Sequence, residues 1–130
     1  MNWPMELIGK PWVSGARGPD AFDCYGLVHW VYREQRGIVL PTLAGLEAKD
    51  VLEVARTFKI ESAMWDQVAT PKNLDVVAMS MNTRIHHVGI WLDMDGGLVL
   101  HSMERSCVVA QSLQSLRGSG FQLIQFHTLK

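Results

Sequence analysis

The chain has 130 residues, 48% of them hydrophobic, and a formal net charge of -1. Because a near-neutral chain creates no long-range field, we expect no nucleic-acid partner and no attraction to anionic membranes. The length and composition predict one globular domain over residues 1–130, and the absence of an apolar span or an export signal predicts a chain that is cytoplasmic as synthesised, without membrane insertion.

The first predicted element is a loop that leads into an amphipathic helix. Residues 1–20 are rich in Gly and Pro, which favours irregular backbone. From Cys24 onward, apolar side chains recur at the spacing of one helical face, and Gly37 provides a C-terminal stop. The sequence therefore predicts a helix that begins near Cys24 and ends before Gly37.

A second helix and a series of strands follow. An apolar stripe predicts a helix over residues 46–60. Short runs rich in branched and large apolar residues predict strands at 74–79, 87–92, 98–102, 107–111 and 121–126. Turn residues between consecutive runs favour antiparallel pairing. We therefore expect an α+β domain with an antiparallel sheet of about five strands and N-terminal helices packed on it.

Cys24 is the candidate nucleophile. The first turn of a helix presents unpaired N–H groups, which can lower a thiol pKa and hold a developing oxyanion. Asp23 is a candidate N-cap, and Gly26 leaves space where a substrate backbone could approach. The alternative is a buried cysteine that serves only as a small hydrophobic residue.

Two histidines at predicted strand ends could complete the site. His87 opens one strand and His101 ends the next, so antiparallel pairing can bring the two imidazoles together. One would accept the thiol proton while the other fixes its tautomer. His86 competes for the role of base. Strand alternation predicts that His86 and His87 point to opposite faces, with His87 on the face of Gly89 and Trp91.

Two other uses of these residues are open. Cys107 follows His87 and His101, which is the order of permuted relatives of the fold, but its valine neighbours predict a strand instead of a helix start. Cys24, His86, His87 and His101 could supply zinc ligands, yet they lack the close-spaced ligand pair of a typical zinc site. We expect neither a metal nor any other cofactor.

Four motifs resemble the NlpC family of peptidoglycan peptidases, which has a papain-like fold. They are residues 12–16, the helix start at 22–28, the strand 87–92 and the residues 100–102. The resemblance spans most of the chain. It implies a cysteine peptidase with catalytic Cys24, His87 and His101, acting on the stem peptide of the bacterial wall, commonly between D-glutamate and a diamino acid. Trp12, Asp23, Tyr25 and Gly26 are the implied substrate-binding residues.

Two positions depart from the family pattern. Trp12 stands where the family usually has Tyr, so it could line the cleft or simply be a buried aromatic residue. Tyr25 replaces a common Ser and resembles the tail-assembly peptidases of tailed phages and their prophage remnants. This resemblance implies a phage- or prophage-encoded, tail-associated enzyme that acts at the wall as part of a particle, with phage tail proteins as partners. The alternative is a catalytically silent structural component of a tail.

Overall fold

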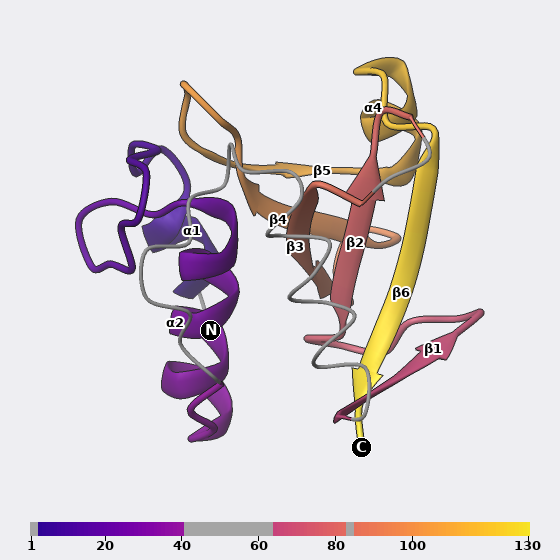
Figure 1. Ribbon diagram of the computed structural model, residues 1–130, viewed down its shortest axis with the longest axis horizontal. Coiled ribbons are helices and arrows are strands. Elements are labelled where there is room, and N and C mark those ends of the chain that lie inside the picture. Colours follow the sequence, from indigo (N-terminus) through magenta and orange to yellow (C-terminus); the bar gives the residue numbers. More distant parts are fainter. Residues whose placement is uncertain (1–2, 41–63, 83–84) are drawn as a thin grey trace.

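A computed structural model describes residues 3–40, 64–82 and 85–130. Its sheet has six strands in the order β1-β6-β2-β3-β4-β5, and every neighbouring pair is antiparallel. Helix α2 lies along one side of this sheet, while α4 lies at the upper end of the view beside β5 and β6 (Figure 1). The α+β architecture is confirmed, with six strands in place of about five.

The helices and strands have the following bounds. The strands are β1 (Trp65–Val68), β2 (Val76–Ser80), β3 (His87–Leu92), β4 (Leu98–Ser102), β5 (Val108–Gln111) and β6 (Leu123–Leu129). The described helices are α1 (Trp3–Leu7), α2 (Cys24–Arg36) and α4 (Leu113–Gly118). None of these helices has the length and apolarity needed to cross a membrane.

Capping residues define both ends of α2. The side chain of Asp23 accepts a hydrogen bond from the N–H of Gly26, which satisfies a donor in the first turn. Gly37 takes a left-handed conformation with φ of 65° and donates its N–H to the carbonyl of Arg33, so it ends the helix. The predicted helix is therefore confirmed at both ends.

Strand alternation divides the core into two layers. One layer lies between α2 and the sheet and includes Cys24 and Leu27 with Val88 and Ile90. The other layer contains Trp91 and further buried residues of β2, β4, α4 and the segment before β6: Val77, Met79, Val99, Leu116 and Phe121. Full burial of one Val, Leu or Phe side chain contributes about 1.5–3 kcal/mol, so both layers hold the sheet in place.

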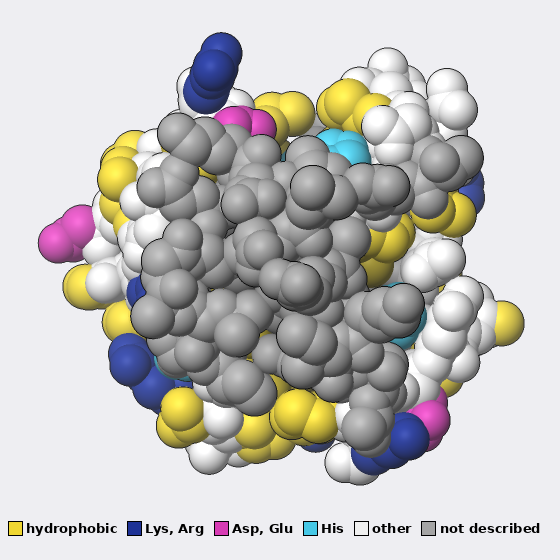
Figure 2. Space-filling view, in the orientation of Figure 1, with side chains coloured by type: hydrophobic (Ala, Val, Ile, Leu, Met, Phe, Trp, Pro, Cys, Tyr) yellow, Lys and Arg dark blue, Asp and Glu magenta, His cyan; other side chains and the backbone are white. Residues whose placement is uncertain are grey.

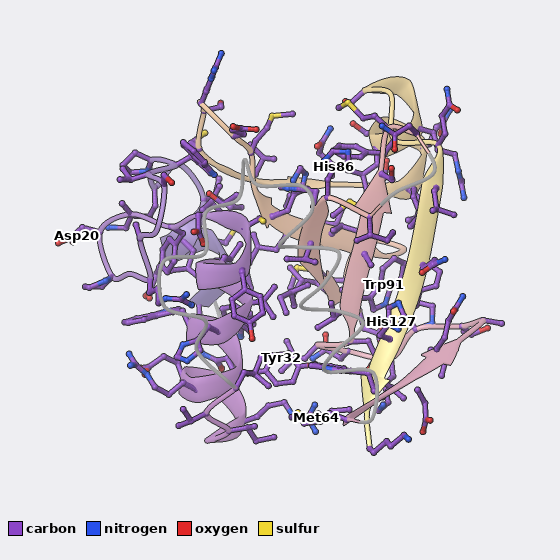
Figure 3. All side chains as sticks on the ribbon, in the orientation of Figure 1. Asp20, Tyr32, Met64, His86, Trp91 and His127 are labelled. Carbon is purple, nitrogen blue, oxygen red and sulfur yellow. The ribbon has the colours of Figure 1, made fainter. Side chains whose placement is uncertain are left out.

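Tyr32 fastens the middle of α2 to the sheet. Its hydroxyl donates a 2.5 Å hydrogen bond to the carbonyl of Leu74, and its ring packs edge-on against Trp65. Figure 3 shows Tyr32 extending from α2 toward the strands. The contacts connect the helix to residues more than thirty positions later in the chain, which fixes how α2 lies on the sheet.

Several element predictions need correction. The segment predicted as loop contains α1, the strand β1 was not predicted, and α4 lies in a stretch without a predicted element. β1 is a short edge strand, whose pattern carries little signal. α4 spans only six residues and depends on its N-cap, Ser112. The helix predicted over residues 46–60 lies outside the described residues.

Candidate active site

The start of α2 is tied to the loop before it by Asp23. One carboxylate oxygen accepts the N–H of Gly26 at 2.6 Å and the other accepts the N–H of Gly15 at 3.0 Å. The N–H of Asp23 in turn donates to the carbonyl of Ala16. The N-cap prediction for Asp23 is confirmed, and these three bonds fix the first residue of the helix, Cys24.

Gly26 is required by close packing of the same loop. A Cβ atom at this position would lie 2.1 Å from the carbonyl oxygen of Ala16, closer than any side chain tolerates. The close approach of the Ala16 carbonyl therefore explains why residue 26 has no side chain. The role of Gly26 in substrate binding stays a prediction.

The sulfur of Cys24 is fully buried and lies against the beginning of β3. Backbone groups of Val88, Tyr25 and Cys24 itself favour negative charge on it and act to lower its pKa. Val88 directly follows His87, so the thiol and the predicted base are brought to the same strand end. A direct contact between the sulfur and the His87 ring stays a prediction.

His87 and His101 form a buried pair. The Nε2 atom of His87 lies 2.8 Å from Nδ1 of His101, and the two rings are nearly perpendicular. On its other side, Nε2 of His101 lies 2.7 Å from the side-chain oxygen of Gln111. Phe121 packs against both imidazoles, with its ring stacked on that of His87. The pairing of β3 and β4 thus brings together two of the predicted site residues.

His86 occupies a different hydrogen-bonding position. Its Nε2 accepts the backbone N–H of Met81, which directly follows β2. Its ring also stacks on Phe121, so the expectation that His86 and His87 point to opposite faces is wrong. The reason is that His86 precedes the strand, where alternation does not apply. Figure 3 places His86 at the upper end of the sheet.

Burial controls the ionisation of these groups. It raises the pKa of the Cys24 thiol to about 12, and the charge of Asp23 adds to this effect. Burial also lowers the pKa of His87 well below its usual value, as do the neighbouring His101 and His86. The pKa of His101 is lowered by burial too, against the opposing effect of Gln111. The expectation of a thiol pKa lowered by the helix start is therefore wrong, because desolvation outweighs the backbone donors.

The remaining predicted binding residues surround the helix start. The backbone of Trp12 pairs with Phe22, and its indole Nε1 is buried without a hydrogen-bond partner in the described part of the chain. Tyr25 is buried, with the guanidinium of Arg17 over its ring at 5.5 Å. Trp12 is thus paired with the residue before Asp23, and Tyr25 directly follows Cys24, whereas the contact of either with a substrate stays a prediction.

A cavity opens next to His87. It has a volume of about 350 Å³ and is lined by Met81, His86, His87, Met103, Glu104 and Phe121. Figure 2 shows a histidine side chain at the upper edge of the molecule, with hydrophobic side chains close to it. The cavity therefore gives a largely apolar approach to the imidazole of His87.

Cys107 lies away from a helix start. It is a free, partly buried thiol that precedes β5, and its backbone pairs with Pro11. The structure thus supplies no N-terminal helix dipole for this cysteine. Among residues 3–40, 64–82 and 85–130, no group of three His, Cys, Asp or Glu side chains is placed to hold a metal ion.

Comparison with known proteins identifies the fold and the family. The sequence pattern of the NlpC/P60 family matches residues 9–127, which is nearly the whole chain. The chain belongs to the NlpC/P60 family. This confirms the family resemblance and assigns the helix of Cys24, the strand of His87 and the strand of His101 to one family domain.

Two curated relatives are described as probable endopeptidases. A probable endopeptidase p60 of Listeria grayi is 29% identical over 88% of this chain, and a probable endopeptidase of Corynebacterium glutamicum is 33% identical over 80%. The matched parts cover only 19% and 42% of those two proteins. The NlpC/P60 domain therefore spans less than half the length of these relatives.

Solved structures share the fold. The NlpC/p60 domain of the peptidoglycan hydrolase SagA has a TM-score of 0.63 at 23% identity, with 95% of this chain and 91% of that chain covered. An N-acetylmuramoyl-L-alanine amidase from Bacteroides uniformis has a TM-score of 0.51 at 16% identity, covering 98% and 97%. At these identities the likeness concerns the architecture of the NlpC/P60 domain.

Proposed function

We propose that this NlpC/P60 domain is a cysteine peptidase that hydrolyses a peptide bond in the stem peptide of bacterial peptidoglycan. Cys24 is the nucleophile, His87 the base and His101 the residue that orients the base. The observation that carries the proposal is the 2.8 Å bond between His87 and His101 at the strand end where the backbone of Val88 meets the sulfur of Cys24. The descriptions of the relatives support the substrate class.

The hydrogen bonds assign the ring nitrogens of His87. Its Nε2 is occupied by His101, so Nδ1 is the atom left to accept the thiol proton. Because the raised thiol pKa and lowered imidazole pKa favour a neutral pair, proton transfer accompanies attack on the substrate instead of preceding it. The sulfur then bonds to the peptide carbonyl carbon, and the carbonyl oxygen becomes an oxyanion.

The helix start supplies donors for that oxyanion. The backbone groups of Cys24 and Tyr25 favour negative charge at the sulfur, and in this proposal their N–H groups also stabilise the oxyanion. His87, now protonated, gives its proton to the leaving amine. Water, deprotonated by His87, finally hydrolyses the thioester and restores the thiol.

We further propose the bond between D-glutamate and a diamino acid as the cleavage site, and a phage- or prophage-encoded, tail-associated setting. The family resemblance supports the first, and the bulky Tyr25 supports the second. Mass spectrometry of digested muropeptides identifies the bond. Purification of tagged protein together with phage tail proteins would support the tail-associated setting, and a chain recovered without them would contradict it.

Replacement of Cys24 tests the proposal. Cys24→Ala should abolish cleavage of purified muropeptides, because no other thiol lies at a helix start in the described residues. Cys107→Ala is the matched control and should digest them at nearly the wild-type rate. Circular dichroism would confirm that both variants fold. Cleavage by folded Cys24→Ala at the wild-type rate would exclude the proposed nucleophile.

A catalytically silent tail component is the second candidate. The full burial of Cys24 and its raised pKa favour it, because an inactive domain can keep a protonated core thiol. The same digestion separates the two functions. A silent domain leaves muropeptides intact with the wild-type protein, whereas a peptidase releases new amino termini that are absent with Cys24→Ala.

A further inference from the structure

Gln111, at the end of β5, contacts His101 on the ring nitrogen that does not face His87. We propose that Gln111 is a positioning residue that sets the tautomer of His101 and, through it, the tautomer of His87. The inference rests on the proposed function, because only a base needs one defined free nitrogen. It adds to the site a residue that neither touches the sulfur nor lines the cavity beside His87.

The orientation of the Gln111 amide determines which nitrogen donates in each hydrogen bond from Gln111 through His101 to His87. The side-chain oxygen of Gln111 can only accept, so Nε2 of His101, 2.7 Å away, must carry a proton. Nδ1 of a neutral His101 is then an acceptor, and Nε2 of His87, 2.8 Å away, must donate to it. The Nδ1 atom of His87 is left with its lone pair, which is the form that can take a proton from Cys24.

The amide nitrogen of Gln111 faces helix α4. The amide nitrogen of Gln111 donates to the hydroxyl of Ser115 at 2.9 Å and to that of Ser119 at 3.3 Å. Ser115 lies in α4 and Ser119 is its C-cap. With the nitrogen directed toward these two hydroxyls, the oxygen faces His101.

The opposite orientation would inactivate the base. If the amide nitrogen faced His101, Nε2 of that ring would become the acceptor and Nδ1 would carry the proton. The bond to His87 would reverse, and Nδ1 of His87 would present an N–H to the sulfur. A base with the wrong tautomer cannot accept the proton, and such a change costs about 10⁴-fold in the serine-protease triad.

The register of the sheet makes this contact possible. Val109 pairs with His101 and Gln111 pairs with Val99, so Gln111 lies two residues along β5 on the same face as His101. β5 is the edge strand, and the chain turns directly from Gln111 through Ser112 into α4. Helix α4 thereby places the hydroxyls of Ser115 and Ser119 next to the side chain of Gln111.

Two substitutions at Gln111 test its proposed control of the histidine tautomers. Gln111→Met removes the acceptor at similar length, and we expect kcat to fall about 10–100-fold, as when outer hydrogen-bond partners of functional histidines are lost. KM should change little, because Gln111 does not line the cavity. Gln111→Glu keeps an acceptor for His101, and the serine hydroxyls can donate to its second oxygen. It should retain most activity at about pH 8.5, above the usual histidine range.

Gln67→Met is the matched control. Gln67 is exposed on β1, at the opposite edge of the sheet, so this variant should keep wild-type kcat and tautomers. ¹⁵N NMR of the imidazoles provides the readout that a purely structural role would not change. In the wild type, both His87 and His101 should carry their proton on Nε2, and Gln111→Met should show a mixture of tautomers for each.

The two proposals fail in different ways. The proposed role of Gln111 is overturned if Gln111→Met keeps the wild-type tautomers of His87 and His101 together with wild-type kcat. It is equally overturned if folded Gln111→Glu is as inactive as Gln111→Met. It is also overturned if wild-type His101 carries its proton on Nδ1. Activity retained by Cys24→Ala would instead overturn the proposed nucleophile, while the NMR spectra would still decide whether Gln111 sets the tautomers.

Discussion

The thiol of Cys24 meets opposing influences from its surroundings. Backbone groups of Val88, Tyr25 and Cys24 itself favour the thiolate, whereas full burial and the carboxylate of Asp23 favour the thiol. Burial is the largest of these effects, so the free protein holds a neutral thiol. In the proposed mechanism, Cys24 therefore passes its proton to His87 only as it attacks a bound substrate.

Alkylation of a protein with one cysteine would test this ionisation state. In a Cys107→Ser variant, we expect iodoacetamide to modify Cys24 slowly near pH 7 and faster only toward strongly alkaline pH, because the pKa of Cys24 is raised to about 12. The rate is followed by intact mass against pH. A rapid reaction near pH 6 would indicate a preformed thiolate and contradict the neutral pair.

The sequence alone identified those candidate site residues that lie in a recognisable local pattern. Cys24 at a helix start and His87 and His101 at successive strand ends all follow from local signals, and the structure brings the two histidines into contact. The pKa of Cys24 was predicted in the wrong direction, because burial depends on the whole fold. Gln111 was missed. Alternation within one strand cannot relate it to His101, because only the β4 and β5 register places the two side chains on one face.

At the level of elements, the start of α2 depends on a loop and a cap acting together. Asp23 accepts two backbone N–H groups, one from the helix and one from the loop at Gly15. Gly26 permits the carbonyl of Ala16 to pass directly over the first turn. These contacts position Cys24 before any substrate binds.

Replacement of the cap should loosen this arrangement. We expect Asp23→Ala to lower the free energy of unfolding by about 1–2 kcal/mol, because the first turn loses its acceptor and Gly15 loses a partner. Urea denaturation measures the change. The matched control is Asp20→Ala, an exposed position that Figure 3 shows at the outer edge of the molecule, and it should change stability little. Equal effects of the two variants would contradict the role of the cap.

The sequence predicted long elements better than short ones. The helix at Cys24 and the strands that begin at His87 and Leu98 carry clear periodicity and stop signals, and their bounds are confirmed. β1 and α4 have four and six residues, too few for a periodic pattern to stand out. β6 begins at Leu123 instead of residue 121, because Phe121 is used to pack against the histidines.

Over the whole molecule, the sheet gathers residues that are distant in the chain. β6 lies between β1 and β2, an order that no local signal could predict, and Phe121, just before it, reaches His87. The same packing buries His87, His101 and Cys24, so the site and the core depend on each other. Stability should therefore vary with the protonation of the site.

The direction of that dependence follows from the pKa shifts. His87 and His101 have lowered pKa values when folded, so the unfolded chain binds more protons and stability falls as pH drops below about 6.5. The pKa of Cys24 is raised from 9.0 to about 12, so stability also falls as pH rises through that range. Urea midpoints should be highest between these limits, and Cys24→Ala should reduce the alkaline loss. A midpoint that rises as pH falls below 6.5 would contradict the buried neutral histidines.

A stem-peptide analogue with an electrophilic vinyl sulfone near the position of the scissile bond tests the central claim most directly. If, as proposed, binding brings the electrophile to the thiol and His87 accepts the proton, mass-spectrometric peptide mapping should find the adduct on Cys24. The adduct should be absent from Cys24→Ala and should form much more slowly in His87→Gln. An adduct on Cys107, or equally fast labelling of Cys24 without His87, would contradict the account.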